Sequence, residues 1–355
     1  MKAGIVGLPQ AGTTTLFNAL TGAHGEVGGY HPGEHVDVAT VRVPDERLRE
    51  LEDLFQPKEV IPATIQFEDI GGVFAHLTGG EHSGRAVAAL READAVLMVL
   101  RCFESPFVAE VFGQVDPLRE YRAMAEEMLL ADLEVIEKRL SSIEADLKKP
   151  VPEREELERE RDLLQRCQRA AEQQSALTSV EINEVEQKML RSYSFLTLKP
   201  RICVLNIDED QIPEPPQIEE IGPQTISVCA ELEMEIMELD EEERELFLEA
   251  AGLEEPAVGR IIRACYEEMG LRSFFTYVSD KLRAWTVQAG TGARAAAGKI
   301  HSDMEKGFIR AEVVSFEELQ ECGSLKDARA SGKLRMEGKD YEVQDGDIIT
   351  FHFSR

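Results

Sequence analysis

A glycine-rich segment near the N-terminus constrains the fold more than any other feature of the chain. The short apolar run Lys2–Val6 leads directly into Gly7–Thr14, and a helix is expected over Thr14–Leu20. A strand, a glycine-rich turn and a helix in this order are the setting of the phosphate-binding P-loop, whose form is GxxxxGK[ST]. The glycines permit a tight turn in which successive backbone N–H groups point toward an anion at the helix start.

This turn departs from the motif at one position. Thr13 stands where the motif has lysine, whereas Thr14 matches the hydroxyl residue that holds Mg²⁺. A hydroxyl supplies a hydrogen bond without charge, which loses about 1 kcal/mol relative to a charge-assisted bond, and more in a dry site. We expect backbone binding of phosphate to persist and stabilisation of a transferring phosphoryl group to suffer most. Taken alone, the segment also fits a strand–helix turn without a ligand.

Two further motifs follow predicted strands. Residues 69–72 (DIGG) have the D-x-x-G form of a second switch motif and end a strand predicted over Thr64–Ile70. The aspartate would organise Mg²⁺ through water, and the backbone of Gly72 would sense the terminal phosphate. Residues 206–209 (NIDE) follow the apolar run Ile202–Leu205, where a base-recognition motif belongs. Three motifs in this order, each at a strand end, predict a nucleotide crevice.

The remaining pattern of residues 1–117 supports an α/β fold. Val36–Val43 alternates apolar and polar residues, as a half-buried strand does. Ala95–Leu100 is fully apolar, which is typical of a central parallel strand. Strands that alternate with helices in this way predict a doubly wound α/β sheet.

An insertion with a different periodicity interrupts this pattern. Apolar residues recur at spacings of three and four from Leu133 to Leu147, and this spacing resumes from Leu157 to Ala171. Pro150 and Pro152 separate the two segments. We therefore expect two helices in an antiparallel coiled-coil hairpin, either as a structural arm or as a docking surface for a partner.

The segment from about Tyr277 onward predicts a small mixed sheet with one or two helices. Phe274, Phe275 and Trp285 are expected to be core residues rather than stacking platforms. Short strand-like stretches are separated by glycine turns. These stretches are Ile309–Val314, Lys333–Met336, Tyr341–Val343 and Ile348–Phe353.

Charge and cysteine content limit the classes of partner. The net charge is −29, but residues 277–355 hold 13 acidic and 12 basic residues, so nucleic-acid contact is expected only locally, through this segment. The six cysteines form no CxxC pair, and no apolar run is long enough to cross a membrane. These features predict a reduced, cytoplasmic protein without membrane contact. The candidate basic patch, which a balanced surface would also explain, comprises Lys299, His301, Lys306, Arg310, Lys333, Arg335 and Lys339.

Several long blocks of sequence carry a family resemblance that runs nearly from end to end. They include residues 4–22 (GIVGLP…LFNALTG), 43–48 (VPDERL), 129–134 (LLADLE), 196–200 (LTLKP) and 298–312 (GKIHSDMEKGFIRAE). With these blocks the chain resembles the YchF subfamily of Obg-related P-loop NTPases, the Obg-like ATPases. The resemblance implies a nucleotide protein that binds ATP or GTP with Mg²⁺ and is associated with ribosomes and translation factors.

The same resemblance implies a domain arrangement and a set of site residues. A Ras-like P-loop NTPase domain (residues 1–117 and 196–276) would be interrupted by the coiled-coil helical arm (118–195). An α+β, ubiquitin-like TGS domain (277–355) would follow. Thr14 and Asp69 would hold the metal. The expected nucleotide-binding residues are Gly7, Gln10, Ala11, Gly12, Thr13, Thr14, Thr15, Gly72, Asn206, Ile207, Glu209 and Cys229.

The chain also departs from the family pattern. The P-loop asparagine of the family is Gln10 here, and its lysine is Thr13. The first-switch threonine falls on Gly33, and a histidine proposed as catalytic in the family falls on Glu110. We therefore expect nucleotide binding with slow or absent hydrolysis, and no catalytic residue is assigned.

Two other functions fit these residues. The chain could be a nucleotide-independent scaffold that binds a ribosomal or protein partner through the coiled coil and the TGS domain. It could also be an active ATPase in which Arg85 or Arg91 replaces the missing lysine charge.

Overall fold

A computed structural model describes residues 1–22, 36–78, 84–105, 114–150, 152–222, 224–251, 253 and 255–354. The chain forms two compact units, Met1–Ala39 with Gln66–Val258 and Thr40–Ile65 with Gly259–Arg355. The boundaries of these two units differ from the domain boundaries expected from the sequence. The expected domain boundaries therefore stay predictions. Among the helices in these described ranges, none is both long and apolar enough to span a bilayer.

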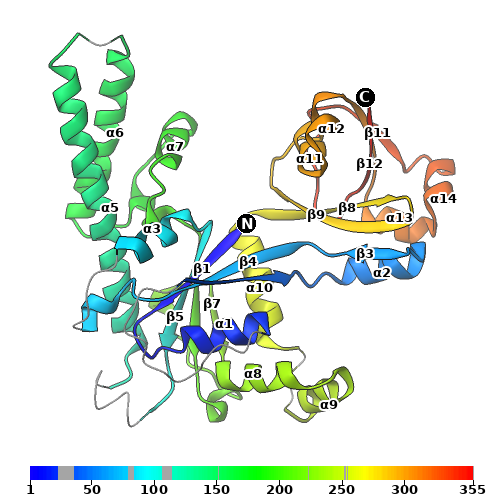
Figure 1. Cartoon of the computed structure of the whole chain (residues 1–355), viewed down its shortest axis with the longest axis horizontal. Coiled ribbons are helices and arrows are strands. Elements are labelled where there is room, and N and C mark those ends of the chain that lie inside the picture. Colours follow the sequence, from blue (N-terminus) through cyan, green and yellow to red (C-terminus); the bar gives the residue numbers. More distant parts are fainter. Residues whose placement is uncertain are drawn as a thin grey trace. The chain divides into compact units, whose positions relative to one another are not determined.

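The first unit is built on a six-stranded sheet with the order β2-β4-β1-β5-β6-β7 (Figure 1). The pairs that β1 forms with β4 and β5, and β6 with β5 and β7, are parallel. The carboxyl ends of these strands therefore meet at one edge, as the sequence predicted. The strands are β1 (Lys2–Gly7), β2 (Val36–Arg42), β4 (Thr64–Ile70), β5 (Ala95–Arg101), β6 (Arg201–Asn206) and β7 (Thr225–Val228).

Helices cover this sheet. Every residue of β5 is buried, and Met98 and Leu100 pack in one cluster with Met124 and Met128 of the long helix α5. Helix α1 lies beside α8 (Figure 1). Outside the insertion, the helices of this unit are α1 (Thr13–Thr21), α3 (Gly84–Glu92), α8 (Ala230–Glu238) and α9 (Glu241–Ala251), whereas α10 (Ala257–Glu268) belongs almost entirely to the second unit. Short 3₁₀ turns occur at η1 (Ala75–Thr78), η2 (Leu177–Ser179), η3 (Leu196–Leu198), η4 (Glu209–Gln211) and η5 (Glu219–Ile221).

The insertion forms the expected helical hairpin. Helix α5 (Pro117–Leu147) and helix α6 (Arg154–Glu172) lie side by side (Figure 1). Their shared core contains Ile136 and Ile143 of α5 and Leu164 and Cys167 of α6. Because these residues follow the spacing found in the sequence, the two-helix prediction is confirmed. A shorter helix, α7 (Glu184–Arg191), follows.

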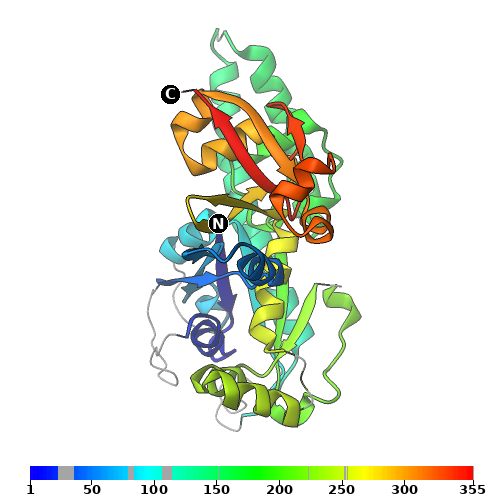
Figure 2. The same cartoon turned by 90° about the vertical axis from the view of Figure 1, so that its right-hand side faces the viewer.

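The second unit contains a mixed sheet with the order β11-β10-β12-β8-β9-β3. Figure 2 shows the C-terminal strand β12, in red, running alongside β10, in orange, to which it is antiparallel. Phe274 and Phe275 are fully buried, as expected. The strands are β3 (Glu59–Ile61), β8 (Leu271–Val278), β9 (Lys281–Gln288), β10 (Phe308–Val314), β11 (Arg335–Glu337) and β12 (Ile348–Phe353). The helices are α2 (Glu46–Phe55), α11 (Ala293–Ile300), α12 (Ser302–Lys306), α13 (Phe316–Cys322) and α14 (Leu325–Ala330).

Two details of this unit differ from the sequence prediction. No strand spans 341–343, because this segment contributes only an isolated bridge between Glu342 and Gly292. Strand β8 begins at Leu271 and pairs with β9 along its whole length, so the sheet starts before the expected boundary at residue 277.

Candidate functional site

The segment between β1 and α1 forms a tight turn with two left-handed residues. Gln10 has φ of 66°, and Gly12, the residue before α1, has φ of 91°. The N–H of Ala11 donates to the carbonyl of Leu8 at 3.0 Å, which closes the turn. No side chain caps the start of α1, so its first N–H groups face outward from a helix N-terminus. This is the backbone geometry of an anion-binding nest.

Two glycines make this turn possible for steric reasons. A Cβ atom on Gly12 would lie 2.2 Å from Nδ2 of Asn206. A Cβ atom on Gly7 would lie 2.9 Å from both the Thr13 methyl group and the carbonyl oxygen of Val99. The expected glycines are therefore required at both positions, and larger residues would displace the turn.

Thr14 and Asp69, which were expected to share a metal, lie in direct contact. The hydroxyl of Thr14 donates to Oδ2 of Asp69 at 2.7 Å, and Asp69 is buried near the end of β4. Gly72, with φ of 83°, follows two residues after the strand. Within the described ranges, no cluster of three or more His, Cys, Asp or Glu side chains could hold a metal by itself. A hydroxyl and one carboxylate suit Mg²⁺, which keeps waters and takes phosphate oxygens as its other ligands.

Asn206 joins the base-recognition segment to the turn. Its Nδ2 donates to the carbonyl of Ala11 at 3.0 Å, and its Oδ1 accepts from the N–H of Ala230 at 3.1 Å. The side chain is buried at the end of β6, so these bonds are shielded from water. One amide thus holds the turn and the start of α8 in a fixed relation.

The remaining expected residues lie near this junction or in the same turn. Ile207 is buried and its N–H donates to Val228, while Glu209 is exposed at the start of η4. Burial raises the pKa of the Cys229 thiol, and the Glu209 carboxylate acts in the same direction. Thr13 and Thr15 are half-buried in the first turn of α1. Gly33 and Glu110, which match the switch threonine and the histidine of the family, lie outside the described residues.

Arg91 is not a substitute for the missing lysine. Its guanidinium donates to Oδ1 of Asp132 at 2.9 Å and to the carbonyls of Ala131 and Ser194 at 2.8 and 3.2 Å. These bonds commit the side chain to the base of the helical arm. Arg85 is exposed on α3.

Asp132 is the centre of a buried junction that the sequence analysis missed. The carboxylate is fully buried and accepts from the N–H groups of Leu196 and Thr197, from the hydroxyl of Thr197 and from Arg91. This junction joins α3, α5 and η3. Asp132 lies in the block LLADLE, but within a helix rich in acidic residues nothing distinguishes it from a surface aspartate.

Two family models match parts of the chain. Residues 2–138 match a model described as a 50S ribosome-binding GTPase, and residues 271–354 match a C-terminal YchF-GTPase model described as a protein of unknown function.

Relatives match over the full length. The ribosome-binding ATPase YchF of Bacillus subtilis is 38% identical and is matched over 100% of this chain and 99% of its own. The protein of the same name from Haemophilus influenzae is 39% identical over 99% of both chains.

Two solved structures are similar in fold. The YchF GTPase of Schizosaccharomyces pombe superposes with a TM-score of 0.85 at 28% identity, over 99% of this chain and 97% of that one. A GTP-binding protein from Pyrococcus horikoshii superposes with a TM-score of 0.61 at 18% identity over 100% of both chains, which shows likeness of fold alone.

Proposed function

The chain belongs to the YchF family, and we propose that it binds ATP or GTP with Mg²⁺ at the turn before α1 and acts at the ribosome. The observation that carries this proposal is the bridge made by Asn206 between Ala11 and Ala230. It brings the phosphate turn and the base-recognition segment to one place, as a nucleotide that spans both requires. We place the protein in the cytoplasm, where the ribosomal partner lies.

The phosphates, the base and the metal of a bound nucleotide would each be held by residues of suitable chemistry. The backbone N–H groups from Gly7 to Thr15 would hold the phosphates, because they are aimed by the left-handed residues Gln10 and Gly12. Asn206, Ile207, Glu209 and Cys229 would surround the base. Thr14 and Asp69, already 2.7 Å apart, would hold Mg²⁺. The metal would neutralise phosphate charge, and Gly72 would sense the terminal phosphate.

We propose that hydrolysis is slow or absent. Thr13 offers a hydroxyl where a lysine would place a full charge against the phosphates. Catalysis of phosphoryl transfer depends almost entirely on positioning and on charges that stabilise the transition state. The loss of this cation therefore weakens turnover more than it weakens binding.

Replacing Thr13 with lysine is expected to tighten nucleotide binding by about tenfold or more, equivalent to about 1.4 kcal/mol, because a charge-assisted bond replaces a neutral one. Isothermal titration calorimetry with ATP and GTP, each with Mg²⁺, measures this. Gln187→Lys, which adds the same charge at an exposed position of α7, serves as the control and should leave affinity unchanged. Absence of binding heat and of a thermal shift at millimolar nucleotide in the wild type would contradict the proposed binding.

The second candidate function is a nucleotide-independent scaffold, and Thr13 is the observation that favours it. In this case the helical arm and the C-terminal domain would bind a ribosomal or protein partner whether or not a nucleotide occupies the turn. Co-sedimentation with ribosomes in ATP, in ADP and without nucleotide separates the two. Equal capture in all three conditions would favour the scaffold, and capture that depends on nucleotide would favour the first function.

We also propose that the C-terminal domain is a TGS domain that contacts ribosomal RNA. Lys333 and Arg335 both lie within 4 Å of the carboxylate of Glu318, and Arg335 also lies 3.8 Å from the carboxylate of Glu337, so two acids offset the two positive charges. The RNA contact is therefore assigned to the other half of the basic patch. His301 and Lys306 line an open pocket of about 620 Å³ there, and Lys299 and Arg310 are exposed.

A further inference from the structure

A piece of the N-terminal sequence is built into the C-terminal unit. Residues 40–65 lie in the chain between the position of the first switch, Gly33, and the second switch motif at 69–72. They nevertheless form one compact unit with residues 259–355. The segment is entered from β2 and left through β4, and both strands belong to the sheet whose edge carries the nucleotide turn.

Backbone pairing fixes the far end of this segment. Strand β3 is parallel to β9, with Glu59 opposite Lys281 and Ile61 opposite Arg283. Just before β3, the N–H of Lys58 donates to the carbonyl of Asp280 at 2.8 Å, and its ammonium lies 2.7 Å from the carboxylate of Asp280.

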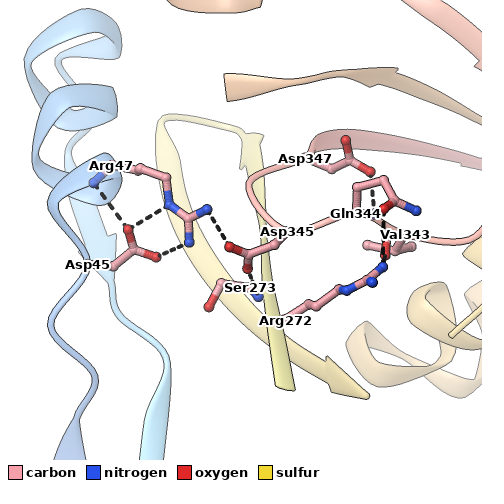
Figure 3. Close-up of polar contacts among 8 residues, drawn as sticks. All are labelled: Asp45, Arg47, Arg272, Ser273, Val343, Gln344, Asp345 and Asp347. Carbon is pink, nitrogen blue, oxygen red and sulfur yellow. Dashed lines mark hydrogen bonds and ion pairs between the residues drawn. The ribbon is translucent and has the colours of Figure 1, made fainter. Parts of the chain in front are cut away.

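Arg47 fixes the near end, at the start of α2. Its Nε and Nη2 donate to the two carboxylate oxygens of Asp45, both at 2.9 Å, and its Nη1 donates to Oδ2 of Asp345 at 2.7 Å (Figure 3). The guanidinium also lies over the ring of Phe275, 5.6 Å from its centroid. One side chain therefore bridges an aspartate of the segment and an aspartate of the C-terminal sequence, with the planar geometry that favours arginine over lysine.

Asp345 is held in place from the other side. Its Oδ1 accepts from the N–H of Ser273 in β8 at 2.7 Å (Figure 3). The N–H of Gly346 donates to the carbonyl of Ser273 at 2.8 Å. A Cβ atom on Gly346 would lie 2.9 Å from Nη1 of Arg47, so glycine leaves room for the guanidinium. The bridge thus ends on the central part of the sheet and not on a loose loop.

Aromatic stacking adds a third attachment at the end of α2. The rings of Phe55 and Tyr277 stack with centroids 4.5 Å apart and planes 2° from parallel. The segment is therefore attached along its whole length, and its two ends cannot shift independently of the C-terminal sheet without breaking packed contacts.

We propose that residues 40–65 are a mechanical link through which nucleotide occupancy of the turn changes the conformational dynamics of the C-terminal domain, with Arg47 as the residue that fixes the link. This inference rests on the proposed nucleotide binding. Strand β4, through which the segment leaves, carries Asp69, and Asp69 accepts from Thr14 of the nucleotide turn at 2.7 Å, so a nucleotide held at the turn acts on one end of the segment directly. Since coupling is reciprocal, the same contacts bias nucleotide affinity in turn.

Hydrogen–deuterium exchange of the full chain, with and without ATP and Mg²⁺, tests the link in Arg47→Met. This substitution keeps an unbranched apolar side chain and removes the bonds to Asp45 and Asp345 together with the guanidinium over Phe275. In the wild type, ATP is expected to change exchange of β8, β9 and residues 343–347. In the variant this response should fall at least threefold while calorimetry still detects ATP binding.

A matched control and a second variant complete the test. Arg329→Met removes an arginine pair with Glu312, 2.8 Å apart, within the same unit but outside the link, and should keep the full response. Should Arg47→Met lose its cooperative melting transition, Asp345→Asn, which retains an oxygen for Ser273, takes its place. Two outcomes would overturn the link alone: ATP binds the wild type but leaves hydrogen exchange in residues 259–354 unchanged, or Arg47→Met shows the same exchange response to ATP as the wild type. Absence of ATP binding in the wild type would overturn the proposed function and the link with it.

Discussion

Gly12→Ala is expected to reduce nucleotide affinity at least 100-fold. The new Cβ would lie 2.2 Å from Nδ2 of Asn206, and alanine would have to adopt φ of 91°. Left-handed backbone costs a residue other than glycine about 1–2 kcal/mol. If Asn206 moves away, its bonds to Ala11 and Ala230 are lost at about 1 kcal/mol each. The free variant can relieve these costs by rearranging the turn, and nucleotide binding must then restore it, so together they correspond to about two decades of affinity, measured by calorimetry with ATP and Mg²⁺.

A second glycine of the same helix separates backbone strain from steric conflict. Gly22, which ends α1, also has positive φ, at 62°, but a Cβ there would meet nothing within 4 Å. Gly22→Ala should therefore lower stability slightly and leave affinity within about threefold of the wild type. Comparable affinities for Gly12→Ala and the wild type would show that the turn held by Asn206 is not the nucleotide site.

The elements with strong local periodicity could be predicted from the sequence. Strand β4 lies at Thr64–Ile70, as the pattern indicated, and the helical hairpin follows the spacing of its apolar residues. Strand β3 could not be predicted, because three residues carry no period and their partner, β9, is more than 200 residues away. The strand predicted over Tyr341–Val343 was wrong for the same reason, because this turn-rich segment carries no local signal and forms only an isolated β-bridge, between Glu342 and Gly292.

The candidate site was predictable to the extent that it depends on strand ends. Asp69 and Asn206 lie at the ends of the parallel strands β4 and β6, and Thr14 lies in the helix that follows β1. The sheet topology alone therefore brings these three residues to one edge. The bond from Asn206 to Ala11 was not predictable, since it depends on side-chain direction across 195 residues of sequence. The contact that occupies Arg91, one of the two arginines considered as a substitute cation, was not predictable for the same reason, because its partner on α5 lies 41 residues away.

Asp132→Ala is expected to destabilise the protein by about 3 kcal/mol. The fully buried carboxylate accepts from two backbone N–H groups, the hydroxyl of Thr197 and Arg91. Its removal leaves these donors without an acceptor and the Arg91 charge, whose side chain is 19% exposed, without its counterion. Urea denaturation followed by far-UV circular dichroism should show a lower midpoint at an unchanged slope.

The control for this prediction is Glu134→Ala, two residues further along the same helix at an exposed position, which should change stability by no more than about 0.5 kcal/mol. A double-mutant cycle of Asp132→Asn with Arg91→Met then isolates the pair. Because both side chains belong to one junction, the double variant should be more stable than the sum of the single losses implies. Strictly additive losses would mean that Arg91 and Asp132 act separately, with Arg91 attaching α3 to the arm through the carbonyls of Ala131 and Ser194 and not through the carboxylate.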